Sequence, residues 1–171
     1  LVHQKELQDA RAEAEQKLEK LLLQQSEKIG EIQDDINSRM ELINRVVTEK
    51  QETAPLLYVS PQKDIIFETP GNTSEGTAFK SLVVYDLSIL ELRPVPAIIH
   101  DSNILKRIED VHLEHILERY QSTKSQVFIA FDKADSTTEN AHRILEETAI
   151  LRLSDGNELF GRSWSKYGLN D

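Results

Sequence analysis

The N-terminal third of the chain carries a seven-residue repeat of apolar positions. One set of positions recurs every seven residues, and most of an interleaved set is also apolar (Leu22, Ile29, Ile36, Ile43; Leu18, Ile32, Val46). No proline interrupts residues 2–52, and Gly30 is the single glycine there. This spacing predicts a long helix whose apolar stripe faces a partner helix, as in a coiled coil. A helix packed along its own domain is the alternative, although helices of globular domains usually run ~8–20 residues.

Beyond Thr53-Ala54-Pro55 the pattern changes to short apolar runs that alternate with amphipathic stretches. We expect strands at residues 56–59, 64–67, 94–101 and 126–131, and helices at 77–92, 106–121 and 140–147. The last helix has a cap candidate in Ser136, Thr137 or Thr138, and a hairpin is expected around residues 154–157, between 148–153 and 158–160. Alternation of helices and buried strands predicts an α/β unit with parallel strands at its centre. We therefore divide the chain into a coiled-coil helix, residues 1–52, and an α/β lobe, residues 53–171.

Charge and composition narrow the classes of partner. The formal net charge is −10, with 8 Lys and Arg against 12 Asp and Glu in residues 1–52, and 12 against 18 in residues 53–171. An acidic balance argues against an extensive nucleic-acid interface on this chain, because phosphate binding needs clustered cations. DNA binding by a complete assembly stays open.

Two absences also bear on the location of the protein. Without cysteine the chain has neither disulfides nor thiolate metal sites. No secretory signal and no apolar run of ~18 residues is present, so we expect a cytoplasmic protein without a membrane span. The chain does not start with methionine, and we expect it to be part of a longer protein.

Three polar features follow one another in the α/β region. The loop 72–77 leads into a helix with Ser74 at the N-cap position, which makes either an anion site or an ordinary capped helix. An apolar strand then ends at Asp101, where the carboxyl edge of a parallel sheet collects ligands and where phosphoryl-transfer proteins hold Mg²⁺. A second buried strand ends at Asp132 and is expected to deliver polar side chains to the same edge.

Two histidine patterns offer competing chemistry. His112 and His115 have helical metal-ligand spacing with Glu114 nearby, but no third ligand has a convincing spacing. His100 beside Asp101 suggests a general base with its orienting carboxylate, but no nucleophile motif accompanies the pair.

The order of loop, acidic strand end and second strand resembles the C-terminal lobe of an SMC-type ABC ATPase, in which a coiled-coil arm returns to a signature loop, a Walker B strand and a switch strand. More narrowly, four stretches resemble an uncharacterised bacterial family of coiled-coil ATPases that gene context links to three-component ABC conflict or defence systems. They are FKSLVVYD (79–86), IIHDS (98–102), QVFIAFDK (126–133) and GNELFG (156–161). The resemblance covers about residues 53–167 and implies a P-loop-type ABC ATPase C-terminal lobe.

The resemblance implies a phosphate contact from the signature loop. Ser74 and Gly76 match the signature Ser and Gly that contact the γ-phosphate of ATP held by the opposite protomer. Glu75 replaces the first signature Gly. Asp110 corresponds to the dimer-facing loop Asp, although its spacing from Asp101 is slightly long.

The resemblance also implies a catalytic edge with departures from the usual pattern. Asp101 matches the Walker B aspartate that holds Mg²⁺. Ser102 stands where these ATPases place the catalytic Glu that activates water. Phe131 or Asp132 stands in place of the switch His, and Asp132 would orient water or metal. Hydrolysis is therefore expected to be slow or to use a different base.

The leading hypothesis is an ATPase half-domain in which ATP held between two protomers closes a dimer and moves the coiled-coil arms, in bacterial defence or DNA transactions. No G-x-x-x-x-G-K-[ST] loop occurs in the chain, so we expect it to be inactive alone. The expected partners are its own N-terminal ATPase lobe, a second copy and other components of the system. The alternative is a non-catalytic coiled-coil dimerisation and protein-docking module, which Ser102 and the missing switch His favour. Direct DNA binding ranks third.

Overall fold

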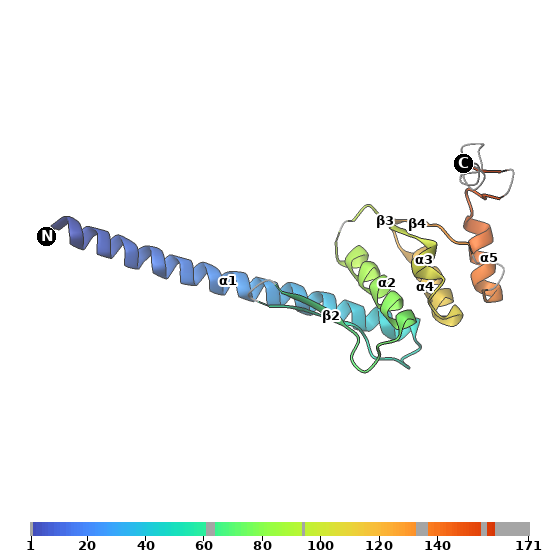
Figure 1. The fold of residues 1–171 in the computed structure, drawn as a ribbon, viewed down its shortest axis with the longest axis horizontal. Helices are drawn as coiled ribbons and strands as arrows, with labels where there is room; N and C mark the ends of the chain where they lie inside the picture. The colour runs from blue at the N-terminus through green and yellow to red at the C-terminus, as the bar shows by residue number, and fades with distance from the viewer. Residues whose placement is uncertain (1, 61–63, 94, 133–136, 155–156, 160–171) are drawn as a thin grey trace, which may run out of the picture.

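A helix that projects far beyond the rest of the molecule dominates the structure, a computed structural model that describes residues 2–60, 64–93, 95–132, 137–154 and 157–159. This helix, α1 (Val2–Val47), extends away from a small lobe gathered at its C-terminal end (Figure 1). The predicted long helix is confirmed, but it ends five residues early, in a turn at residues 48–50. Glu49 and Lys50 adopt positive φ there, and Lys50 N donates to Arg45 O at 2.9 Å.

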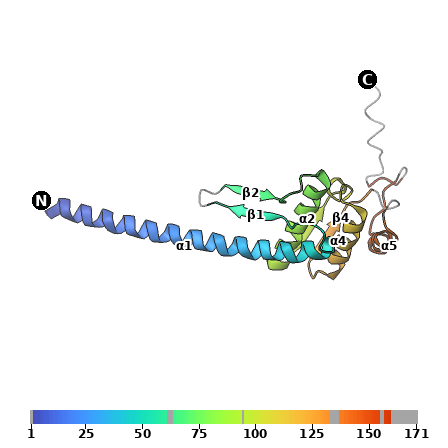
Figure 2. The ribbon, with the colours of Figure 1, turned by 90° about the horizontal axis from the view of Figure 1, so that it is seen from below.

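A two-stranded hairpin runs back along α1 (Figure 2). Strand β1 (Leu56–Val59) pairs antiparallel with β2 (Ile65–Glu68), with Leu57 opposite Phe67. Side chains of α1 satisfy the other edge of β1. Asn37 bonds both backbone groups of Leu57, at 2.8 and 2.9 Å, and Gln33 accepts from Val59 N at 2.8 Å. The hairpin is therefore fixed to the helix by amide side chains one turn apart.

The lobe alternates helices with two parallel strands. Helix α2 (Glu75–Leu92) leads to β3 (Ala97–His100), and the short α3 (Ser102–Leu105) and α4 (Asp110–Ser122) lead to β4 (Gln126–Ile129). β3 and β4 pair in parallel, with Ala97 opposite Gln126, and α5 (Glu139–Thr148) follows. The mixed α/β fold with a small parallel sheet is as predicted. Thr138, one of the three cap candidates, accepts from Ala141 N and starts α5; Ser136 lies outside the described residues.

The core of the lobe includes the end of the long helix. Ile36, Met40, Ile43 and Val47 are buried together with side chains of α2, α4 and α5. In this segment the helix packs along its own domain, which was the alternative interpretation of the repeat. Toward the N-terminus the leucines are exposed instead (Leu7, Leu18, Leu21, Leu22, Leu23). The apolar stripe is thus divided between the lobe and a surface that no described residue covers.

Two details of the sheet and the C-terminal region differ from expectation. β3 and β4 were predicted as buried strands, but Ile99 is 78% exposed and Phe128 is 40% exposed. Two strands alone leave one face of a parallel sheet uncovered, which is unusual for this sheet type. The strand expected at 148–153 does not form, since Thr148 ends α5 and residues 149–153 are irregular. An isolated bridge joins Ser154 to Asn157; Asp155, Gly156 and Phe160 lie outside the described residues. Within the described ranges, none of the helices combines the length and apolar character that a bilayer-spanning helix requires.

Candidate functional site

Ser74 forms the N-cap of α2, as its position in the sequence predicts. Its Oγ accepts from Thr77 N at 3.2 Å and donates to Thr77 Oγ1 at 2.8 Å, while Ser74 N donates to Asn72 Oδ1 at 3.0 Å. The capping bonds hold the loop 72–74 against the first turn of α2. Backbone N–H groups at a helix N-terminus favour an anion, and the positive end of the helix dipole adds to this preference.

Gly76 lies where the chain leaves no room for a side chain. A Cβ at this position would lie 2.9 Å from the backbone oxygen of Arg107. The Arg107 side chain crosses back over the same region, paired with Glu75 and stacked 5.6 Å from the ring centroid of Phe79. The first turn of α2 is thereby clamped to the segment that precedes α4. Glu75 is engaged in an ion pair with its own lobe.

A cavity of about 460 Å³ opens beside this turn. It brings together three of the predicted phosphate-contact residues, Ser74, Gly76 and Asp110. The remaining lining is strongly polar and comes from the same two regions and from the segment after α1 (Glu52, Asn72, Thr77, Lys80, Arg107, Ile108, Glu109, His112). The fourth predicted residue, Glu75, does not line it.

Two of the three predicted catalytic residues, Ser102 and Asp132, meet at the carboxyl end of the parallel strands, away from this cavity. Ser102 Oγ donates to Asp132 Oδ1, and Lys106 Nζ lies 3.5 Å from Asp132 Oδ2. Asp101, between the end of β3 and α3, is exposed and accepts from Asn103 Nδ2 at 3.0 Å. The second strand therefore delivers a carboxylate to the edge where the first one ends, as predicted.

The electrostatics of this edge keep Asp132 charged. The hydrogen bond from Ser102 lowers the pKa of Asp132, and the nearby Lys106 ammonium lowers it further. Phe131, the other candidate for the switch position, is partly buried and packs against the core. Of the two, only Asp132 presents a polar group to the edge.

His100 does not pair with Asp101, its neighbour in the sequence, but with side chains of α2 and α4. It is buried, with Nε2 2.9 Å from Asp86 Oδ2 on α2 and Nδ1 bonded to the Tyr120 hydroxyl on α4. Burial, with the Asp86 charge nearby, raises the pKa of Tyr120. The network ties β3 to both helices, and Asp101 takes no part in it. A general base made of His100 and Asp101 is therefore not what the structure shows.

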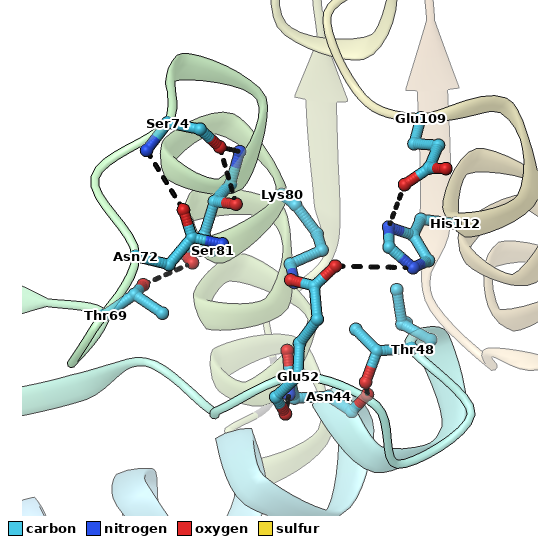
Figure 3. A network of polar contacts seen from close by, with 12 residues as sticks. Asn44, Thr48, Glu52, Thr69, Asn72, Ser74, Lys80, Ser81, Glu109 and His112 are labelled. Carbon is cyan, nitrogen blue, oxygen red and sulfur yellow. Dashed lines mark hydrogen bonds and ion pairs between the residues drawn. The ribbon is translucent and has the colours of Figure 1, made fainter.

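A second polar network forms part of the cavity wall (Figure 3). Lys80 on α2 is 1% exposed and its ammonium pairs with Glu52 Oε2. Asn44 on α1 holds the same residue from below, with Nδ2 donating to Glu52 O at 2.9 Å. His112 on α4 lies between two carboxylates, 3.7 Å from Glu52 Oε1 and 3.7 Å from Glu109 Oε2. Sequence reasoning missed this network, although a lysine on the buried face of an apolar helix indicates a buried acidic partner.

The histidine pair proposed from helical spacing does not form one site. His115 Nδ1 is 2.9 Å from Val47 O, and Glu114 accepts from Thr138 and Asn140. His112 is instead grouped with Glu52, from the segment after α1, and with Glu109, the N-cap residue of its own helix. Burial lowers the pKa of His112, an effect that Lys80 reinforces and that Glu52 and Glu109 oppose.

Comparison with known proteins gives one clear relationship. No protein of curated function matches the chain significantly. A solved structure from a study of the "Structural biochemistry of ATP-driven dimerization and DNA stimulated activation of SMC ATPases" matches 68% of this chain and 75% of that chain, with a TM-score of 0.48 and 14% identity. We draw no functional conclusion from a likeness at this level. The model of a family described as "Uncharacterised protein conserved in bacteria (DUF2326)" matches residues 32–164, which is most of the chain. The chain therefore belongs to the DUF2326 family of bacterial proteins.

Proposed function

We propose that this chain is the C-terminal lobe of an SMC-like ABC ATPase, in which ATP and Mg²⁺ bound between two protomers control the position of the α1 arms. The observation that carries the proposal is the pairing of Ser102 with Asp132 next to Asp101, at the carboxyl end of two parallel strands. Ligands of α/β proteins bind at this edge. In the complete site Asp101 would hold Mg²⁺ through water, and the Ser102–Asp132 pair would orient the water that attacks the γ-phosphate.

The cavity beside α2 supports the second half of the proposal. Ser74, Gly76 and Asp110 line one cavity at a helix N-terminus. In an ATP-bound dimer this cavity would receive the γ-phosphate that the opposite protomer holds. One lobe would then contribute its sheet edge to one nucleotide and its α2 turn to the other.

Two exposed apolar surfaces support the proposal, because each would be covered by one of the proposed partners. Ile99 and Phe128 lie exposed on the two-stranded sheet, where an N-terminal lobe with a phosphate-binding loop would add further strands. The exposed leucines of α1 would pack on an arm helix of the same or another chain. Moving arms would act on DNA or on other components of a defence system.

A non-catalytic docking module is the competing function, and one contact favours it. The Asp132 carboxylate is engaged by Ser102 and lies close to Lys106, so it is less available to activate water. We therefore expect nucleotide-controlled dimerisation with slow hydrolysis. A pure docking module would show neither ATP binding nor an effect of Asp101.

The test uses the full-length protein, in which the proposal places an N-terminal ATPase lobe before this chain. ATP-dependent dimerisation is measured by sedimentation and turnover by phosphate release, for the wild type and for Asp101→Asn. We expect Asp101→Asn to abolish turnover. The matched control is Asp64→Asn, which removes an exposed aspartate beside β2 and should change neither quantity. Turnover that persists in Asp101→Asn would refute the role of Asp101, and a wild type that neither dimerises with ATP nor releases phosphate would favour the docking module.

A further inference from the structure

We propose that Glu52, Glu109 and His112 form a binding site for a divalent transition-metal ion, with Zn²⁺ as the representative ion. The three residues come from the segment after α1, the N-cap of α4 and the first turns of α4. One ligand atom from each lies within 4.8 Å of the other two. This site differs from the magnesium position at Asp101 and does not depend on the proposed ATPase function.

The separation between His112 Nε2 and Glu52 Oε1 suits shared coordination of one ion better than a direct hydrogen bond, whereas Glu109 lies beside the opposite ring nitrogen. His112 Nε2 is 3.7 Å from Glu52 Oε1, and Nδ1 is 3.7 Å from Glu109 Oε2. Both separations exceed the ~3.2 Å limit of an N–H···O bond. Ligands bound 2.0–2.1 Å from one tetrahedral zinc lie about 3.4 Å apart. A small contraction therefore brings Glu52 and His112 into coordination distance.

The third ligand has the freedom to complete the site. Glu52 and His112 are held in place, and the His112 side chain is 14% exposed. The Glu109 side chain is 73% exposed, so its rotation toward the ring nitrogen that faces Glu52 meets little resistance. Two fixed ligands and one mobile ligand permit capture of an ion without a change in the fold.

Lys80 orients the Glu52 ligand. Its ammonium binds Oε2 and leaves Oε1 directed toward His112, as shown in Figure 3. A hydrogen bond to the other oxygen of a ligating carboxylate is a common supporting contact in metal sites. The Lys80 and Arg107 charges in the lining oppose a dication, but the three carboxylates of Glu52, Glu109 and Asp110 outnumber them.

The donor set selects the class of ion. One imidazole nitrogen with two carboxylate oxygens suits Zn²⁺ and related first-row ions, whereas Mg²⁺ prefers oxygen ligands only. Three protein ligands leave a fourth position that faces the cavity with Ser74. A bound ion would join the segment after α1 to the start of α4, and so fix the base of the arm.

The experiment uses the untagged chain, freed of metal with a chelator and then titrated with ZnCl₂. Binding is followed by calorimetry and by ¹⁵N chemical shifts of the histidine rings. We expect one ion per chain to perturb the His112 ring selectively, and MgCl₂ to leave it unchanged. His112→Ala and Glu109→Gln should each weaken the binding by at least about tenfold.

Matched controls lie one turn further along α4. His115→Ala and Glu114→Gln remove the same chemical groups from the same helix and should leave zinc binding within about twofold. Glu109→Gln changes an exposed side chain and is not expected to disturb folding, which circular dichroism checks. Equal binding by His112→Ala and His115→Ala would overturn the proposal. So would a His112 ring signal that ZnCl₂ does not move, or one that MgCl₂ moves equally.

Discussion

Replacing Gly76 by alanine tests how tightly the first turn of α2 is clamped to the segment before α4. The added Cβ would lie 2.9 Å from the backbone oxygen of Arg107, closer than Cβ atoms approach other heavy atoms. Neither atom sits at the end of a flexible side chain, so the two segments must move apart. Forced expansion of this kind costs about 1–3 kcal/mol. Alanine recovers up to about 1 kcal/mol of helix propensity. From the middle of the range, a cost of about 2 kcal/mol, this leaves a net destabilisation of roughly 1–2 kcal/mol.

Urea unfolding followed by circular dichroism measures this loss. With a slope of about 2 kcal/mol per molar, the transition midpoint of Gly76→Ala should fall by roughly 0.5–1 M. Gly30→Ala is the matched control, because nothing lies within 4 Å of its added Cβ in the middle of α1. There alanine should be neutral or stabilising by up to about 1 kcal/mol. A Gly76→Ala variant as stable as the wild type would show that the close approach to Arg107 is not a constraint.

Three further substitutions test the core, the buried histidine network and the cap of α5, each by urea unfolding. Tyr120→Phe leaves His100 Nδ1 buried without its partner and should lower the free energy of unfolding by about 1–3 kcal/mol; an unchanged value would refute the hydrogen bond. Met40→Ala empties a fully buried position on α1 and should cost about 2–5 kcal/mol, whereas a loss below 1 kcal/mol would mean that α1 is not part of the core. Thr138→Ala removes the N-cap of α5 and should cost about 1 kcal/mol. Because the Thr138 hydroxyl lowers the pKa of Glu114 below its ordinary 4.5, part of that contribution is present above pH 4.5 and disappears as the pH falls through the lowered value. The deficit of the variant should therefore shrink in acid, and a constant deficit would contradict the Glu114 contact.

Local signals placed α2 and α5 well, whereas the helix expected at 106–121 begins only at Asp110 and the short α3 was not predicted. Ser74 and Thr138 cap α2 and α5 as their positions suggest, because a capping hydroxyl acts within three residues of itself. The sequence prediction placed the end of α1 too late, because the contacts that end this helix lie more than three residues away along the chain. No glycine or proline stands at residues 48–50, and the turn is held by contacts such as Asn44 Nδ2 to Glu52 O, which only the folded chain creates. Neither the apolar periodicity nor the turn residues of the sequence predict such contacts.

The sheet edge was predictable, but the cavity network was not. Two apolar runs that each end in a polar residue place Asp101 and Asp132 at one edge, since parallel strands end on the same side. Lys80 carries a weaker signal, because its position on the buried face of α2 calls for an acid without saying which one. Thirty acidic residues are available in the sequence. The choice of Glu52 depends on the turn after α1, which the sequence pattern did not reveal.

The division of the α1 stripe limits how an arm can act on this lobe. Ile36, Met40, Ile43 and Val47 belong to the core, so a partner helix cannot take their place without unfolding the lobe. Most exposed apolar side chains of the helix lie before residue 29, and we expect pairing to engage mainly this part, a lever of about 40 Å at 1.5 Å per residue. At the base of that lever, Asn44 holds the backbone of Glu52, and Glu52 holds Lys80 on α2. On the proposed function, a tilt of the arm is transmitted through these contacts to the helix whose first turn meets the phosphate.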